Sequence, residues 1–125
     1  MIGYVTLGTN NFDEAASFYD ALMGEIGAGR FMEDANFIAW AVAPGQPAIS
    51  IIKPFNGEAA TTGNGTMVAL AVGSSEKVDA LYAKALEMGG VDEGKPGLRG
   101  DTFYAGYFRD LDGNKLNAYC IVQPS

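Results

Sequence analysis

The side chain in this sequence that most clearly suggests a chemical role is an amide within an apolar strand. In the stretch YFRDLDGNKLNAYC, residues 107–120, a tight turn joins two predicted strands, and Asn117 stands between Leu116 and Ala118 in the second strand. A buried amide without a partner costs about 1–3 kcal/mol, so Asn117 needs a hydrogen bond to the chain, to water or to a ligand. Tyr107 could offer a hydroxyl to the same ligand.

Further side chains could bind a flat or apolar compound by stacking and orient it by hydrogen bonds. The aromatic candidates are Trp40, in a predicted strand, and Phe103 and Tyr104, in the stretch DTFYAGYF. Packing in the core is the alternative for each of them. Lys53 and Arg99 could hold an anion, or they could be solvated surface charges.

Other kinds of chemistry are excluded by the residues that the sequence lacks. It contains no histidine, so the commonest general base and the commonest metal ligand are both absent. A single chain therefore cannot form a Ser-His-Asp or a Cys-His catalytic site. The only cysteine, Cys120, lies in the apolar run AYCIV and is predicted to be a buried small hydrophobe, not a nucleophile.

The composition is that of an ordinary folded domain with an acidic surface. The chain has 125 residues, of which 48% are hydrophobic and 18% charged, and this length suits one domain. A net charge of −7 repels phosphate backbones and anionic membranes, so we expect neither nucleic acid nor a membrane as partner. No apolar run has membrane-spanning length and no signal peptide is evident, so we expect a cytoplasmic protein.

The elements that must position these residues form a pattern that occurs twice. We expect helices near 12–23 and 75–88, with strands near 2–8, 27–33, 36–43, 47–54, 66–73, 102–109 and 114–122. When the first half is shifted by 63 residues, Val5 aligns with Val68, Leu7 with Leu70 and Tyr19 with Tyr82.

The repeat predicts one module used twice, 1–56 and 64–125, with a polar linker between the copies. Two such modules would arrange their sheets around a shared cleft, which is a natural small-molecule site. The alternative is a chance resemblance between two α/β halves.

Three segments carry a resemblance to a known family. YVTLGTNNFDEAASFYDALMG, GNGTMVALAVGSSEKVDALYAKALEMGG and YFRDLDGNKLNAYC resemble the vicinal oxygen chelate superfamily, which includes glyoxalase I, bleomycin-resistance proteins and extradiol dioxygenases. The most specific sign is a turn with Asp110, Asp112 and Gly113 followed by a strand. The resemblance spans residues 1–125. It implies a single α+β domain whose two βαβββ modules form a cleft of curved mixed sheets.

Metal-dependent members of the family hold a divalent ion with one residue from the first and one from the last strand of each module. The matching positions here are Tyr4, about Ser50, Met67 and Asn117, where the enzymes commonly have His, Gln or Glu. These four side chains carry no negative charge at neutral pH, although divalent ions need carboxylate, imidazole or thiolate ligands. We therefore expect no metal cofactor. Alternate strand residues share a face, so Thr6 accompanies Tyr4.

Three functions remain open: a metal-free protein that binds a small organic molecule, a glyoxalase- or dioxygenase-like enzyme (lyase, isomerase or oxygenase) with an atypical site, and an interaction module whose cleft is filled by its own side chains. We favour the first hypothesis, and whether the chain is an enzyme stays open. Its predicted ligand-binding residues are Tyr4, Thr6, Trp40, Ser50, Met67, Tyr104, Tyr107 and Asn117. Since family members of this size usually pair, we expect a homodimer.

Overall fold

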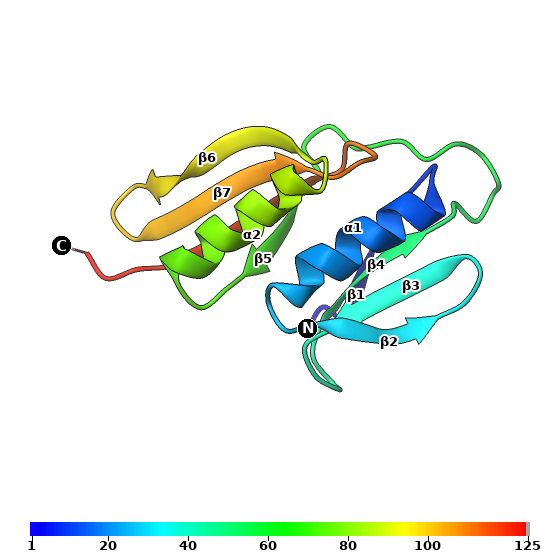
Figure 1. The fold of residues 1–125 in the computed structure, drawn as a ribbon, viewed down its shortest axis with the longest axis horizontal. Helices are drawn as coiled ribbons and strands as arrows, with labels where there is room; N and C mark the ends of the chain where they lie inside the picture. The colour runs from blue at the N-terminus through cyan, green and yellow to red at the C-terminus, as the bar shows by residue number, and fades with distance from the viewer. Residues whose placement is uncertain (125) are drawn as a thin grey trace.

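The computed structural model describes residues 1–124 and contains two modules with the same order of elements (Figure 1). Module 1 consists of β1 (Tyr4–Gly8), α1 (Phe12–Gly24), β2 (Gly29–Glu33), β3 (Phe37–Ala41) and β4 (Ala48–Ile52). Module 2 consists of β5 (Val68–Ala71), α2 (Ser75–Glu87), β6 (Val91–Arg99), β7 (Phe103–Arg109) and β8 (Lys115–Ile121).

Each module folds into its own four-stranded mixed sheet. The strand orders are β1-β4-β3-β2 and β5-β8-β7-β6, so the first strand of each module lies at an edge and pairs with the last. That pairing is parallel, while the other neighbours are antiparallel. The predicted α+β fold with two βαβββ modules is therefore confirmed. The connection between the two parallel strands of each module contains the helix and the two middle strands.

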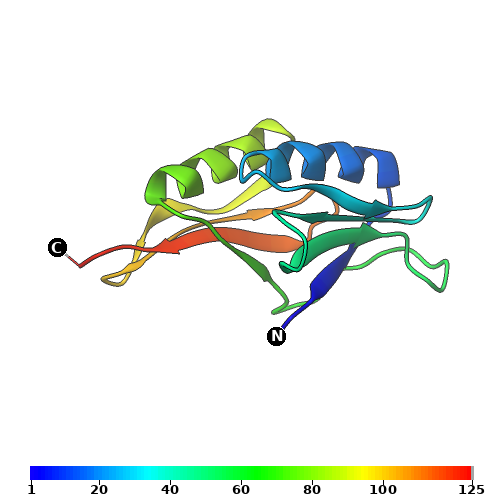
Figure 2. The ribbon, with the colours of Figure 1, turned by 90° about the horizontal axis from the view of Figure 1, so that it is seen from below.

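The two helices lie side by side and cover the same side of both sheets (Figure 2). Each begins at a polar cap, because the side chains of Asn11 and Ser74 accept hydrogen bonds from the first turns of α1 and α2. Their apolar faces join one core with the helix-facing side chains of the sheets. No helix within residues 1–124 is long and apolar enough to cross a membrane.

The predicted elements agree with the structure to within a few residues, except that one strand was not predicted. β6, with the sequence VDEGKPGLR, lacks a regular apolar pattern and contains a proline, so strand propensity gave no signal there. It lies at the outer edge of its sheet and pairs only with β7. Proline is tolerated in an edge strand because its missing N–H can fall on the side that has no neighbouring strand.

The turn between β7 and β8 connects the two modules. The Asp110 carboxylate is 4% exposed and accepts hydrogen bonds from the backbone N–H of Asp112 and of Asn114, and from the Asn114 amide. The Tyr19 hydroxyl, which comes from α1 in module 1, donates to the same carboxylate at 2.6 Å. Gly113 has a φ of 89°, a backbone conformation that glycine adopts most readily.

Two further contacts tie this turn to module 1. The Asn114 amide donates to the Gly8 carbonyl at 3.1 Å, and the Asn10 backbone N–H donates to Asp112 at 2.8 Å. The Asn10 side chain also exchanges two hydrogen bonds with Ala60 in the linker. The motif that resembled the known family most strongly therefore has a structural role, since it fixes module 2 and the linker to module 1.

Candidate functional site

Each sheet has one face that packs on its helix and one that points away from it, called here the helix face and the open face. In β1 and β4, Leu7, Ile49 and Ile51 belong to the core shared with the helices. Alternation along a strand then places Tyr4, Thr6 and Ser50 on the open face of module 1. By the same argument, with Leu116, Ala118 and Cys120 in the core, the open face of module 2 carries Lys115, Asn117 and Tyr119.

On the open face of module 1, Ser50 is the buried centre. It lies in β4 between Thr6 of β1 and Ala39 of β3, it is 0% exposed, and its hydroxyl has no hydrogen-bond partner. The rings of Tyr4 and Phe37 come from the strands on either side of β4 and meet edge to face at 6.4 Å. Their contact must cross β4 close to Ser50, which accounts for its burial.

On the open face of module 2, Asn117 occupies the corresponding place. It lies in β8 between Ala69 of β5 and Tyr107 of β7, and it is 1% exposed. Its amide oxygen has no hydrogen-bond partner. The ring of Tyr119, two residues along β8, stacks on Phe103 at 5.1 Å.

Ser50 and Asn117 are thus equivalent residues at the centre of the last strand of each module. Theirs are the two buried side-chain polar atoms within residues 1–124 that lack a hydrogen bond. More than nine in ten buried polar groups in folded proteins have a partner, so these two exceptions call for one. A water molecule or a ligand could supply it from the open face.

The residues around these two positions do not fit a divalent metal. Ser50 is flanked on β1 by Thr6, and Asn117 is flanked on β5 by Ala69, which carries no donor atom. Met67 precedes β5 and offers only a thioether. Across residues 1–124, no group of three or more His, Cys, Asp or Glu side chains could hold a metal ion. A cation without negative ligands in a buried setting would lack charge compensation.

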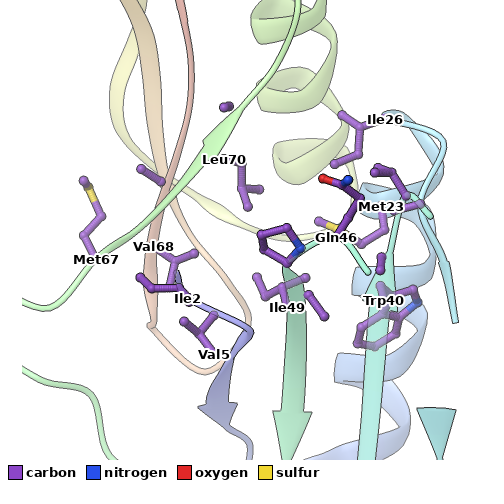
Figure 3. A pocket seen from close by; sticks show the side chains of 17 residues that line it. Ile2, Val5, Met23, Ile26, Trp40, Gln46, Ile49, Met67, Val68 and Leu70 are labelled. Atoms are coloured by element: carbon purple, nitrogen blue, oxygen red, sulfur yellow. The ribbon is translucent and has the colours of Figure 1, made fainter. Parts of the chain in front are cut away.

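A cavity of about 610 Å³ lies between the two modules, beside the edge strands β1 and β5, each of which is paired on one side only (Figure 3). Its walls include Val5 and Ile49 from module 1 and Val68 and Leu70 from module 2. Gln46 is the one polar side chain among the residues that line it. This size and lining are typical of small-molecule sites. The cavity also reaches Ala69, the neighbour of Asn117 in the sheet.

Two predicted site residues lie on the helix faces, away from Ser50 and Asn117. Trp40 is buried and donates from its indole nitrogen to Asp20 at 2.9 Å, and it lines the cavity. The Tyr104 hydroxyl donates to Asp79 of α2 at 2.7 Å. That hydrogen bond raises the pKa of Tyr104.

The remaining predicted residues are divided between the two open faces and the cavity. Tyr4 and Thr6 accompany Ser50, and Tyr4 is 62% exposed. Tyr107 is the direct neighbour of Asn117. Met67 stands at the edge of the cavity. The role of these residues in ligand binding stays a prediction.

Sequence reasoning missed how Arg99 and Lys115 are arranged. Both cations lie over the ring of Tyr107, with Arg99 at 5.4 Å and Lys115 at 5.6 Å from its centroid. Arg99 belongs to the strand that the sequence did not predict, so its face could not be assigned. Lys53, the other predicted anion handle, lies over the Phe12 ring at 5.3 Å.

Comparison with known proteins gives a consistent result. A family model described as the Glyoxalase/Bleomycin resistance protein/Dioxygenase superfamily matches residues 1–118. A glyoxalase/bleomycin resistance protein from Albidiferax ferrireducens is 35% identical, with a TM-score of 0.90 over 98% of this chain and 99% of that one. No curated protein matches the chain.

Two other solved structures extend the likeness. A hypothetical protein from S. aureus is 25% identical, with a TM-score of 0.75 over 96% of this chain and 92% of that one. A glyoxalase/bleomycin resistance protein/dioxygenase family enzyme from Burkholderia phytofirmans is 18% identical, with a TM-score of 0.78 over 96% of this chain and 98% of that one. At 18% identity, the likeness to the Burkholderia phytofirmans protein concerns the fold alone.

Proposed function

Because the chain belongs to the glyoxalase/bleomycin resistance protein/dioxygenase superfamily, we propose that it binds a small, partly apolar organic molecule, and that it does so without a divalent metal. The observation that carries the proposal is the pair Ser50 and Asn117. Each is buried at the centre of the last strand of its module, and each has an oxygen without a partner.

The chemistry of the open faces favours an organic ligand over an ion. Serine and asparagine offer a neutral hydroxyl and a neutral amide, which orient a ligand by hydrogen bonds but do not compensate a double positive charge. Tyr4, Phe37 and Tyr107 provide aromatic surface beside these two groups. An organic molecule needs this combination of apolar area and a few polar contacts.

The cavity between the modules supports the apolar part of the proposal. Its volume of about 610 Å³ lies in the range of known ligand pockets, roughly 300–1,000 Å³. It extends along β5 from Met67 to Ala71, beside the strand that holds Asn117. Ser50 and Asn117 do not line the cavity, so a ligand in it would approach Asn117 through Ala69, its neighbour on β5.

A homodimer is part of the proposal. β1 and β5 are each paired on one side only, and unpaired strand edges are common sites of association between chains. Ile2, Tyr4 and Met67, near these edges, expose large apolar surfaces. Sedimentation at micromolar concentration should give the mass of two chains, and a monomer would refute this part alone.

The ligand can be sought by native mass spectrometry of the purified protein, compared with the same sample after denaturation. We expect an additional mass in the native spectrum that corresponds to an organic compound. Asn117→Leu should reduce the fraction of chains that carry it, while Asn64→Leu, the same change at an exposed linker position, should not. An additional mass equal to a metal ion would instead favour the alternative, an enzyme with an atypical site.

A further inference from the structure

The open face of module 2 carries two cations that lack an acidic partner. Within residues 1–124, neither Arg99 nor Lys115 forms an ion pair. Both lie over the same ring, that of Tyr107, at 5.4 and 5.6 Å from its centroid. Carboxylates hold three of the other cations, namely Arg30, Lys84 and Arg109. Three other lysines within residues 1–124 also form no ion pair, so what distinguishes Arg99 and Lys115 is that both lie over one ring.

The backbone of β6 holds the Arg99 guanidinium in place. Its two terminal nitrogens donate to the carbonyls of Gly97 at 2.9 Å and Lys95 at 2.8 Å. A Cβ on Gly94 would lie 3.3 Å from Nη2 of Arg99 and 3.3 Å from the Tyr107 ring, so the glycine leaves room for both groups. A guanidinium has five N–H donors, and three remain free after these two bonds.

Asn117 completes the arrangement. It faces Tyr107 directly across the β7–β8 pair, and Lys115 lies two residues before it on the same face of β8. The Asn117 side chain is buried, and its amide oxygen has no partner. A guanidinium, an ammonium group, an aromatic ring and an unpaired amide oxygen, which is an acceptor, therefore lie on one sheet face.

We propose that Arg99 and Lys115 form a subsite for the carboxylate of a small organic acid, beside the Tyr107 ring. The unpaired oxygen of Asn117 is an acceptor, so it is left for a hydrogen-bond donor elsewhere on the same ligand. The inference rests on the proposed function, that this chain binds a small organic molecule, and it adds the ligand's charge. The planar fork of an arginine matches a carboxylate, and Lys115 adds a second positive charge. The net negative charge of the chain repels anions at long range, so selection of an anion must come from these local contacts.

The test uses sodium benzoate and its neutral analogue benzamide as probes, with the full chain labelled for NMR at low ionic strength. Benzoate should cause saturable chemical-shift changes at the Tyr107 backbone amide and the Asn117 side-chain amide. Its half-saturating concentration should be about tenfold lower than that of benzamide. Arg99→Gln and Lys115→Gln should each raise the benzoate dissociation constant about tenfold. Lys77→Gln, the same charge change on α2, should leave it unchanged.

Two results would overturn the inference: equal affinity for benzoate and benzamide, or benzoate binding that survives both substitutions. Arg99→Gln removes hydrogen bonds to two carbonyls of β6 and could disturb that strand. Lys115→Gln tests the subsite without this effect, because the lysine donates to no backbone carbonyl within residues 1–124. Benzamide binding that is lost in Asn117→Leu, without preference for benzoate, would refute the anionic subsite and retain the proposed function. Failure of both probes to shift this face would also refute the subsite, and the co-purified ligand would then decide the proposed function separately.

Discussion

The hydrogen bond between Tyr19 and Asp110 offers a measure of how strongly the two modules hold together. Tyr19→Phe removes one hydroxyl that donates at 2.6 Å to a carboxylate which is 4% exposed. Asp110 keeps its three other hydrogen bonds, from Asp112 and Asn114. The substitution therefore removes one hydrogen bond and leaves no donor without an acceptor. A hydrogen bond to a charged group contributes about 1.5–3 kcal/mol, and we expect this loss of unfolding free energy.

The repeat supplies a matched control. Tyr82 occupies the equivalent helix position in module 2, and its hydroxyl donates at 2.7 Å to Asp92 on the exposed edge strand β6. Water can replace the tyrosine there, so Tyr82→Phe should cost less than Tyr19→Phe. Urea unfolding, followed by circular dichroism at one fixed protein concentration, gives both values. A Tyr19→Phe loss no larger than that of Tyr82→Phe would refute the idea that this bond joins the modules.

Three further predictions concern single side chains. Ser50→Ala should leave the unfolding free energy within about 1 kcal/mol of wild type, because the hydroxyl has no partner; in urea unfolding, a loss above about 2 kcal/mol would reveal one. Burial, with the hydrogen bond to Asp92, raises the pKa of Tyr82 from 10.0 to about 12, so its contribution to stability is complete below pH 10 and is lost as the pH rises towards 12. Unfolding at a series of alkaline pH values should show this decline, with a shallower slope in Tyr82→Phe; an equal slope would contradict it. Burial also raises the pKa of the Cys120 thiol, so its reaction with a disulfide reagent at pH 8 should be about tenfold or more slower than in the urea-unfolded chain, and equal rates would show an accessible thiol.

The sequence predicted the modules well because their signals are local. The helix caps, the Asp110–Gly113 turn and the alternation around Asn117 can each be read from a few neighbouring residues. The burial of Cys120 is confirmed for the same reason, since it lies in a continuous apolar run.

What could not be predicted depends on contacts between distant residues. The strand around Trp40 is apolar throughout, so its periodicity does not reveal that Trp40 faces α1 and not the side of Ser50. In the sequence, Tyr19 stands out only by its alignment with Tyr82, and its partner Asp110 is 91 residues away, so no local pattern links the two. The position of Arg99 over Tyr107 depends on β6, which carries no strand pattern of its own.

Metal content after dialysis tests the central claim most directly. The purified chain is dialysed against zinc, nickel, manganese or iron, freed of unbound ion, and analysed by plasma mass spectrometry beside Asn117→Leu. Because Tyr4, Ser50, Met67 and Asn117 offer no negatively charged ligand, the account predicts much less than one ion per chain, with no difference between the two proteins. Recovery of one ion per chain in the wild type, lost in Asn117→Leu, would contradict it and place an enzyme with an atypical metal site first.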